Sequence, residues 1–495
     1  MPAGLVGGLL LAASLPPWPG SGGAWPLGLL GAALVFLGLG GLGWKRRLAV
    51  GAAAGAGLYV PGLWWMRDFS LPGYVVATLL QLAILALALS AVPPSGRWRR
   101  MLAFPAALVV AEAVRGAWPF GGMPISGIEL GQIDGPLAGA ARIGERLLLV
   151  ALVGLAGAGL ASVARRRWRP AIAALAAVAV VAGLGAVSPD GSAAGTLRVA
   201  AVQGGGPRGV RAVSRDPLPV VGRHVEASRR VRPPVDLVLW PEDVVDIDEE
   251  LAGSQIEQGL ADLARSLGTT LVVGVVEDAG DGARFRNAAV VYGPDGSRVD
   301  RYDKVHRVPF GEYVPARGLF DPVADLSAIP RDAIPGRGAG MVDTAAGRMG
   351  VLISYEVFFP ERARDAVRAG GRLLLVPTNA SSYRDEQIPA QEVAVARLRA
   401  VATGRWVVQA APTGYSAVVD HRGRVVAQGG LGGPAVLQDE VGLRSGRTMA
   451  TRLGRAPWTV AALLALLALS KPESLRSRFV ARSPREGYSD TRTIT

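Results

Sequence analysis

The chain has 495 residues, of which half are hydrophobic, and its formal net charge is +13. Its mean hydropathy is positive, which is unusual for a soluble globular protein. No cysteine is present, so disulfides, a thiol nucleophile and a thiolate metal site are excluded. The three histidines are far apart without ligand spacing, which argues against a histidine metal site. We expect neither a metal nor a cofactor.

Long apolar runs fill the first part of the chain, and one more lies near the C-terminus. A helix needs about 20 mostly apolar residues to cross a bilayer. Eight runs approach that length, the first and last being the shortest: residues 3–15, 25–42, 48–65, 73–92, 101–118, 147–164, 171–187 and 457–469. The sequence therefore predicts about eight membrane-spanning helices.

Basic residues cluster in every second connection between these runs. They follow the second, fourth, sixth and eighth runs, at Lys45 to Arg47, Arg97 to Arg100, Arg165 to Arg169 and Lys471 to Arg478. Connections rich in Lys and Arg stay in the cytoplasm. This alternation predicts a multi-pass membrane protein with both termini cytoplasmic and the region after the seventh run extracytoplasmic. It also explains the net charge without nucleic acid.

Composition divides the chain into four parts. We predict an N-terminal transmembrane bundle of about seven spans over residues 1–195, an extracytoplasmic globular domain over 196–452 and a C-terminal transmembrane helix over 453–470. The basic tail, 471–495, has the composition of a disordered segment or one that lies on anionic headgroups.

The globular region alternates unbroken apolar runs, typical of strands covered on both faces, with helical patterns. The turns at 294–296 and 421–423 are expected to join hairpins. An α/β domain with a mixed sheet and outer helices is therefore predicted. Its expected strands are 197–203, 237–240, 270–276, 288–292, 350–354, 373–377, 406–410 and 416–419, and its expected helices are 256–267, 361–368 and 390–403.

Three polar residues stand where apolar runs stop. Ser354 ends the run 350–354, Glu242 follows the strand 237–240, and Lys304 lies in a loop after a hairpin. Separately, each has a more ordinary interpretation as a helix cap or a solvated charge. Together they suffice for acyl transfer, with Ser354 as nucleophile and Glu242 as general base and then acid. Lys304 and a backbone N–H beside residue 354 would stabilise the oxyanion.

A charged pair lies near the end of the fifth apolar run. Glu112 and Arg115 are spaced i, i+3, and ionisable groups at membrane depth are usually paired inside the bundle. A structural ion pair and a contact with a lipid headgroup are equal alternatives here.

Short motifs surround the candidate catalytic residues: Trp240-Pro241-Glu242, the segment VPFGEYVP at 308–315 after Lys304, and Ser354-Tyr355-Glu356. In these motifs the chain resembles the nitrilase superfamily, and specifically its membrane-embedded branch, the apolipoprotein N-acyltransferases. The segment 308–315 is the most specific of them. Glu112, Arg115 and the run Trp-Pro-Phe-Gly-Gly at 118–122 are similar to a signature of the family's membrane region.

The resemblance implies a nitrilase-like αββα sandwich outside the membrane. It places the family's base at Glu242, its oxyanion lysine at Lys304, its second essential glutamate at Glu312, and its Tyr-Glu pair at Tyr355 and Glu356. It further implies a ping-pong reaction in the bacterial cytoplasmic membrane. An acyl chain would move from a phospholipid to the enzyme, and then to the α-amine of the diacylglyceryl-cysteine of an apolipoprotein, with membrane lipids as surroundings and no nucleic acid partner.

Two positions depart from the family. Ser354 stands where the family has cysteine, and a hydroxyl, unlike a thiol, needs its base to remove the proton as it attacks. Three interpretations stay open: a working serine variant, an engineered substitution that stalls catalysis, and a silent homologue. The loop after 376–379 is more polar than in the family, and Tyr383 is either its remaining lid aromatic or an exposed loop tyrosine.

Two other functions compete with acyl transfer to lipoproteins. One is a membrane-tethered amidase or nitrilase-type hydrolase that acts on small amides with water. The other is a lipid-binding or lipoprotein-binding scaffold whose site has decayed at Ser354.

Overall fold

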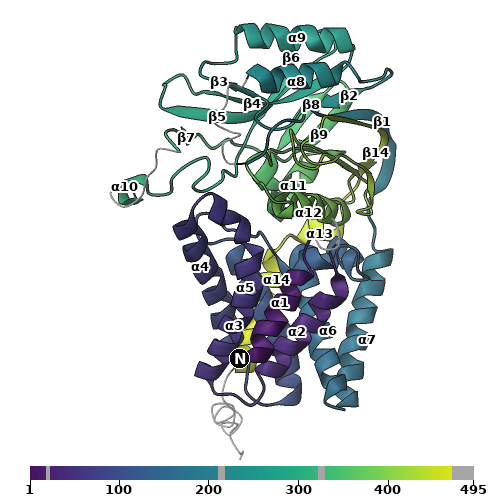
Figure 1. Cartoon of the computed structure of the whole chain (residues 1–495). Coiled ribbons are helices and arrows are strands. Elements are labelled where there is room, and N and C mark those ends of the chain that lie inside the picture. Colours follow the sequence, from purple (N-terminus) through teal and green to yellow (C-terminus); the bar gives the residue numbers. More distant parts are fainter. Residues whose placement is uncertain (18–22, 210–217, 321–328, 471–495) are drawn as a thin grey trace, which may run out of the picture.

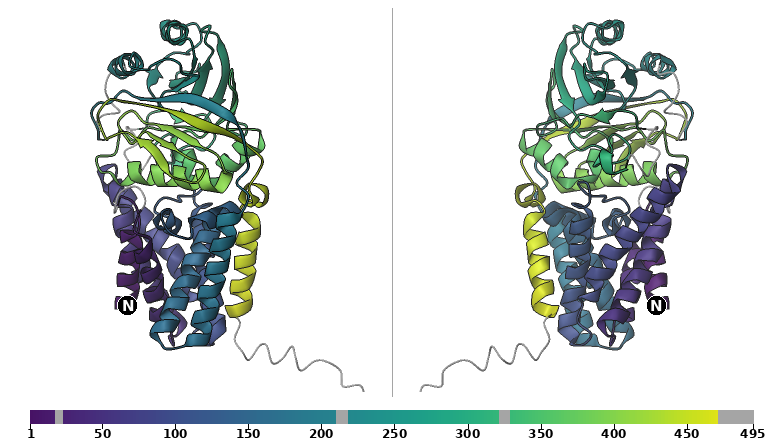
Figure 2. Two further views of the ribbon diagram at one scale, coloured as in Figure 1. Left: turned by 90° about the vertical axis from the view of Figure 1, so that its right-hand side faces the viewer. Right: turned by 90° about the vertical axis from the view of Figure 1, so that its left-hand side faces the viewer.

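The computed structural model describes residues 1–17, 23–209, 218–320 and 329–470. The predicted basic tail, 471–495, lies outside the described residues. The described chain forms a helical bundle and an α/β part stacked on one end of it (Figure 1). Two further views show the same stacking, with the C-terminal helix along the side of the bundle (Figure 2).

Each of the eight apolar runs forms a helix of the bundle. By length and composition, three described helical segments suffice to cross a membrane: Leu71–Ser90, Ala138–Ala164 and Trp168–Val187. The remaining helices are shorter or carry more charge. The bundle helices are α1 (Pro2–Ala13), α2 (Trp25–Gly38), α3 (Trp44–Gly62), α4 (Leu71–Ser90), α5 (Arg97–Arg115), α6 (Ala141–Ala164), α7 (Trp168–Val187) and α14 (Ala456–Ser470), with the 3-10 turns η2 (Trp64–Asp68), η3 (Ile128–Gln132) and η4 (Ala138–Ala140).

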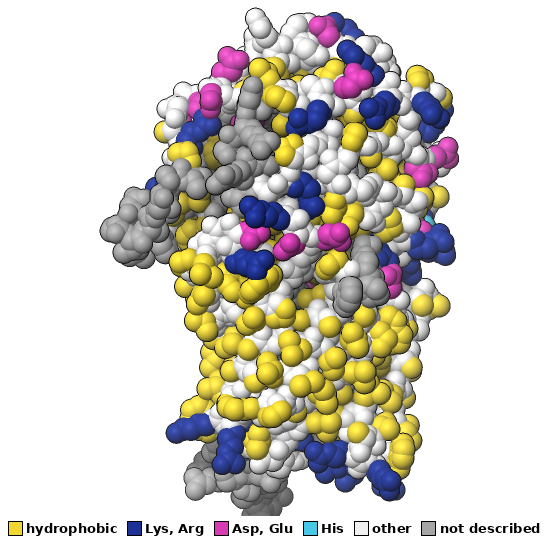
Figure 3. Space-filling view, viewed as in Figure 1, with side chains coloured by type: hydrophobic (Ala, Val, Ile, Leu, Met, Phe, Trp, Pro, Cys, Tyr) yellow, Lys and Arg dark blue, Asp and Glu magenta, His cyan; other side chains and the backbone are white. Residues whose placement is uncertain are grey.

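Hydrophobic side chains cover the outside of the bundle. On the face seen in Figure 3 they form a broad band, and Lys and Arg side chains gather at the end away from the α/β part. Among the bundle residues, Leu79, Leu87 and Leu464 are each more than half exposed. Such a contiguous apolar surface is typical of helices that face lipid rather than water.

Two sheets stack in the α/β part. The first has the strand order β14 (Ala435–Ser445), β1 (Ser192–Gln203), β2 (Leu237–Leu239), β4 (Thr270–Asp278), β5 (Arg284–Tyr292) and β6 (Arg298–Asp303), with β3 (Val245–Ile247) beside β4 and β7 (Asp332–Ala333) beside β5. The second has the order β13 (Val425–Gln428), β12 (Ala417–Val419), β11 (Val407–Ala410), β10 (Leu374–Pro377), β9 (Gly347–Val351) and β8 (Met341–Thr344). Each sheet is mixed, since β1, β2 and β4 run parallel, as do β9, β10 and β11.

Helices cover the outer face of each sheet. The outer pair on the first sheet is α8 (Leu218–Ser228) and α9 (Gln255–Leu267), and the second sheet carries α11 (Pro360–Arg368) and α12 (Gln387–Thr403). Short helices α10 (Arg317–Phe320) and α13 (Met449–Leu453) complete the elements. The layers are therefore helix, sheet, sheet, helix, as predicted, with α11 and α12 on the side of the bundle (Figure 1).

Alternation along the strands explains these layers. Val199 and Leu375 point into the core between the sheets, whereas their neighbours Ala200 and Leu374 face the outer helices. Side chains of a strand alternate between its two faces, so a fully apolar strand supplies two cores. The core beneath α12 continues into the bundle without a break.

The expected strands and helices are all present, with ends that differ by a few residues. The predicted strand 350–354 ends earlier, since β9 stops at Val351 and Ser354 begins the 3-10 turn η6 (Ser354–Phe358). The reason is the carboxylate of Glu356, which accepts a hydrogen bond from the backbone N–H of Ile353 at 2.9 Å and turns the chain out of the sheet. The long strand β14 was not predicted.

Candidate active site

The candidate catalytic residues follow strands of both sheets. Glu242 follows β2, Lys304 follows β6, and Ser354 follows β9. The loop after β10 lies beside them and reaches the bundle, because the ring of Tyr383 packs edge-on against Trp65 at 5.3 Å between centroids. This loop therefore lies on the side of the α/β part that faces the bundle.

Lys304 is held between two carboxylates. Its Nζ donates to Glu242 Oε1 and to Glu312 Oε1, both at 2.8 Å. Asn287, on β5, donates its Nδ2 to the same two oxygens at 2.9 and 2.8 Å. Lys304 is almost fully buried. A buried ammonium needs such partners, and here two acids hold it while the amide of Asn287 fixes the acids.

The charge of Lys304 is secured by this arrangement. Burial alone would lower its pKa, but the carboxylates of Glu242 and Glu312 outweigh burial and raise the pKa above its usual range. An ammonium has three N–H donors, and two of them are used here. The third is available for a developing oxyanion.

Glu312 also fixes its own loop. Its Oε2 accepts a hydrogen bond from the backbone N–H of Val308 at 2.7 Å, so the side chain closes the loop between residues 308 and 312. The backbone turns sharply there, with Phe310 at φ +57°. The segment thus acts as a rigid loop that carries a carboxylate to Lys304.

Ser354 sits in a strained turn. Its φ is +49°, in the left-handed region that costs a non-glycine residue free energy, and such strain is common at functional sites. Its hydroxyl lies 3.2 Å from the Oγ1 of Thr378, the residue after β10. In the described part of the chain this is its only side-chain hydrogen bond, and none joins it to Glu242 or Lys304. Catalytic hydrogen bonds are often formed only once substrate is bound.

Glu356 ties the Ser354 turn to the Lys304 loop. Besides the N–H of Ile353, it accepts the backbone N–H groups of Val305 and His306 at 2.9 and 3.0 Å. It also accepts the phenol of Tyr302 at 2.8 Å. Burial raises the pKa of Glu356, and Arg362 and these N–H groups oppose that rise. Glu356 therefore positions both loops without needing to touch a substrate.

The tyrosines singled out from sequence connect the site to the bundle, whereas Glu112 and Arg115 lie within the bundle. Tyr355 donates to the carbonyl of Gly122 at 3.0 Å, and Tyr383 also lies 5.4 Å from the ring of Phe69. Tyr383 is partly exposed. Glu112 and Arg115 have no exposed surface and form an ion pair of 2.5 Å. They offer no surface to a lipid headgroup.

The pair at Glu112 belongs to a larger buried network. Arg146 binds both Glu112 and Glu129, and Arg115 binds Gln81 and, at 2.6 Å, the carbonyl of Ile125. Two acids and two guanidinium groups thus balance each other, as buried charges require.

Sequence reasoning missed three polar residues of this region: Asn287, Thr378 and Glu392. Asn287 sits within an ordinary strand, and Thr378 is one of several hydroxyls in its loop. Glu392 carried the only available signal, because it is the only acid of α12 and is followed by the apolar residues Val393 to Ala396. It is buried, and its Oε1 lies 2.9 Å from Thr378 Oγ1.

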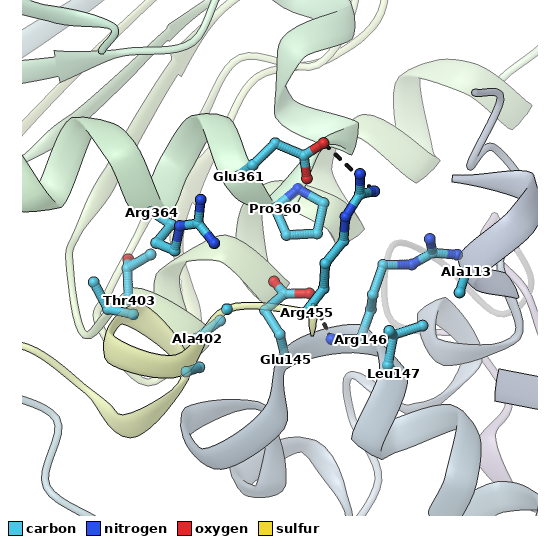
Figure 4. A pocket seen from close by; sticks show the side chains of 13 residues that line it. Ala113, Glu145, Arg146, Leu147, Pro360, Glu361, Arg364, Ala402, Thr403 and Arg455 are labelled. Atoms are coloured by element: carbon cyan, nitrogen blue, oxygen red, sulfur yellow. Dashed lines mark hydrogen bonds and ion pairs between the residues drawn. The ribbon is translucent and has the colours of Figure 1, made fainter. Parts of the chain in front are cut away.

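A small cavity lies elsewhere, where the bundle meets the α/β part (Figure 4). Its volume is about 30 Å³ and its lining includes Glu145, Arg146, Glu361, Arg364 and Arg455. That is room for little more than a water molecule. It holds none of the candidate catalytic residues. Across the described ranges, no group of three His, Asp or Glu side chains could hold a metal ion.

Comparison with known proteins agrees with this architecture. Residues 198–450 match the carbon-nitrogen hydrolase family, and residues 7–159 match the N-terminal domain of apolipoprotein N-acyltransferases. The apolipoprotein N-acyltransferase of Azotobacter vinelandii is 32% identical over 479 residues, which cover 90% of each chain. That of Photobacterium profundum is 29% identical over 440 residues, 83% of this chain and 84% of that protein. The crystal structure of Saccharomyces cerevisiae Nit3, of the nitrilase superfamily, is 23% identical and covers 54% of this chain and 95% of its own, with a TM-score of 0.38.

The α/β part is thus a nitrilase-superfamily domain, here joined to an apolar helical bundle. The chain belongs to the apolipoprotein N-acyltransferase family, which confirms the resemblance predicted from its motifs. Its relatives are acyltransferases, and the protein is an enzyme of that class.

Proposed function

We propose that this protein moves a fatty acyl chain from a phospholipid to the N-terminal amine of the diacylglyceryl-cysteine of bacterial lipoproteins. The observation that carries the proposal is the buried Glu242–Lys304–Glu312 cluster, whose Lys304 loop is tied to the Ser354 turn through Glu356. The segment 308–315 that carries Glu312 contacts the bundle, because the ring of Phe310 packs against that of Phe120. A phospholipid in the outer leaflet would approach from the side of the bundle. Membership in the family supports the same reaction.

In the first half-reaction Ser354 is the nucleophile. Its Oγ attacks the ester carbonyl carbon of the phospholipid while Glu242 takes the hydroxyl proton. The free N–H of Lys304 stabilises the oxyanion of the tetrahedral intermediate. The intermediate collapses as the bond to the glycerol oxygen breaks and Glu242 returns the proton to that oxygen. A lysophospholipid leaves, and the acyl chain stays as an ester on Ser354.

In the second half-reaction the acceptor amine attacks the same carbonyl. Glu242 takes the amine proton, the bond between the acyl carbon and Ser354 Oγ breaks, and the proton returns to Oγ. The product is an amide on the lipoprotein and a regenerated serine. Glu312, Asn287 and Glu356 hold Lys304 and the two loops in place throughout.

We also propose the membrane arrangement. All eight bundle helices cross the cytoplasmic membrane, with 1–195 and 453–470 as the membrane parts and 196–452 as the extracytoplasmic catalytic domain. The alternation of basic connections, together with the Lys and Arg side chains at the far end of the bundle, supports cytoplasmic termini (Figure 3). Helices shorter than about 20 residues are accommodated by local thinning of the bilayer and by the apolar turns that flank them.

Roles follow for the residues near the membrane. Tyr383, packed between the active site and the Trp65 and Phe69 rings, serves as an aromatic gate for the acyl chain. Glu112 and Arg115 serve as a structural ion pair, since both are enclosed.

The test is mass spectrometry of a lipoprotein N-terminus from cells with and without the gene. We expect the N-acyl group to disappear in the deletion strain and to return with the wild-type gene. An unchanged acylation state would overturn the proposal. Purified protein given a labelled phospholipid should release lysophospholipid and carry the label. Turnover of small amides with water and without any lipid donor would instead favour a hydrolase.

A further inference from the structure

A carboxylic acid lies two hydrogen bonds from the candidate nucleophile and has no part in the mechanism above. Glu392 is on α12, is only 3% exposed, and reaches across to the loop after β10. Its Oε2 is buried and has no hydrogen-bond partner among the described residues. An ionised carboxylate with an unpaired buried oxygen is costly, so this site disfavours the charged form.

Thr378 stands between this acid and Ser354. Its Oγ1 lies 2.9 Å from Glu392 Oε1 and 3.2 Å from Ser354 Oγ. All three side chains are buried. A threonine hydroxyl has one proton to donate, so Thr378 can donate to only one of its two neighbours at a time.

The protonation state of Glu392 decides which neighbour that is. An ionised carboxylate only accepts, so Thr378 then donates to Glu392, and Ser354 must donate its own proton to Thr378. A neutral carboxyl protonated on Oε1 donates to Thr378, which then donates to Ser354. The proton of Ser354 is thereby free for the base, and its Oγ gains a donor that stabilises negative charge as it develops.

We propose that Glu392 is a positioning residue that acts through Thr378 to orient the hydroxyl of Ser354, and that its neutral form is the one that supports acylation. This inference rests on the proposed function, since it takes Ser354 as the acylated residue. It also explains how a serine can work in place of a thiol, because a hydroxyl attacks only if its proton points toward a base.

The charges around Glu392 agree with a neutral acid near physiological pH. Burial raises the pKa of Glu392 to about 8, with the hydrogen bond from Thr378 and the ammonium of Lys304 opposing the rise and Glu242 adding to it. Tyr383, from the loop after β10, is the other titratable group that senses it. On α12 itself, Arg397 and Arg399 face Asp134 and Glu145 of the bundle instead. The carboxyl is thus mostly neutral below about pH 8 and ionises above it.

The experiment measures the initial rate at which Ser354 is acylated as a function of pH. Full-length protein in detergent is mixed with a phospholipid that carries an alkyne-tagged acyl chain, and the adduct is quantified by intact mass and mapped to residue 354. In the wild type we expect the rate to fall about tenfold per pH unit above the pKa of Glu392, because the neutral fraction does. Glu392→Gln keeps a side-chain N–H donor for Thr378 at every pH, so its alkaline fall should be absent.

Three further variants sharpen the test. Glu386→Gln removes an exposed acid just before α12 and should keep the alkaline fall of the wild type. Thr378→Val should lower acylation at all pH values, whereas Thr378→Ser should restore it. Added to Thr378→Val, Glu392→Gln should have no further effect, since the path between the two residues is already cut.

The inference is overturned if the acylation rates of Glu392→Gln and the wild type fall equally at alkaline pH. It is also overturned if Glu392→Gln and Thr378→Val lower the rate independently in the double variant. Thermal melting of each variant shows whether it folds. If Thr378→Val does not fold, the comparison of Glu392→Gln with the wild type decides the question. An acyl adduct with an unaltered pH profile would refute only this inference. Absence of an adduct on residue 354 in every protein, under conditions where lysophospholipid is released, would refute the proposed function as well.

Discussion

Tyr355 donates a hydrogen bond of 3.0 Å from its phenol to the backbone carbonyl of Gly122, across the boundary between the sandwich and the bundle. Tyr355 directly follows Ser354, and Gly122 belongs to the connection after α5. The turn that holds the candidate nucleophile is therefore anchored to the bundle. A shift of the bundle against the sandwich would therefore disturb the turn at Ser354.

Replacement of Ser354 tests the nucleophile. Ser354→Ala should abolish the acyl adduct and lower turnover by about 10⁴-fold, as expected when an acyl-transfer enzyme loses its nucleophile. Ser354→Cys should retain or raise activity, because a thiol is intrinsically more nucleophilic and forms a more reactive acyl carrier. The measurement is intact mass after incubation with phospholipid. Full activity of the Ala variant would show that the nucleophile is elsewhere.

Replacement of Glu242 tests the base. Glu242→Gln should lower kcat by about 10²- to 10⁴-fold, since the amide cannot take a proton. The fold should persist because Glu312 still pairs with Lys304. Release of lysophospholipid reports activity, and a melting curve reports folding. Glu440→Gln, at an exposed position of β14, is the matched control and should behave as the wild type.

Glu356 should prove to be a structural requirement of the site. Its two oxygens accept the backbone N–H groups of Ile353, Val305 and His306. In Glu356→Gln one of the two accepting oxygens is replaced by an NH2 group, which cannot accept a hydrogen bond from these N–H groups. The substitution should reduce the free energy of unfolding by about 1–3 kcal/mol. Thermal melting measures this loss of stability. Activity should fall as well, because Lys304 directly precedes the loop residues that Glu356 holds, and it would move with them. An unchanged melting temperature would contradict this role.

The ion pair between Arg399 on α12 and Glu145 on α6 should hold the sandwich on the bundle. Both side chains are buried, so Arg399→Met should cost about 3–5 kcal/mol by leaving a carboxylate unpaired. The double variant with Glu145→Leu should recover much of that loss. By contrast, Arg198→Met breaks an exposed pair with Asp236 and should cost less than about 1 kcal/mol. Equal losses in the two single variants would argue against a role at the junction.

His306 should make stability depend on pH in the mildly acidic range. Its ring stacks on Phe359 with 3.5 Å between centroids, and burial, aided by Arg362 and Lys304, lowers its pKa to about 4. The unfolded histidine has a pKa near about 6.5 and therefore binds more protons between these values. The free energy of unfolding should thus fall as pH drops from about 6.5 to about 4. The melting temperature of the wild type should fall more steeply with decreasing pH over this range than that of His306→Gln. Equal pH dependence of the two melting temperatures would exclude the effect.

The site shows which residues could be predicted and which could not. Glu242, Lys304 and Ser354 each stand shortly after a strand, so the sequence could mark them as candidates. Their strands β2, β6 and β9 are not paired with one another, and only the stacking of the two sheets decides how these strand ends lie. Asn287 offered no signal, because nothing in a strand sequence states which neighbour its side chain will face. Glu392 was visible as the only acid of α12, but its partner Thr378 gave no such signal.

By itself, the sequence determined the helices of the bundle, most strands of the sandwich and the identity of the chemical groups, because hydrophobic periodicity and apolar length act over neighbouring residues. Tertiary structure alone decided the left-handed turn at Ser354, the place of β14 beside β1, and the contact of Thr378 with both Ser354 and Glu392. Those features depend on contacts between residues far apart in the chain, whose geometry is set only when the two sheets, α12 and the bundle pack together.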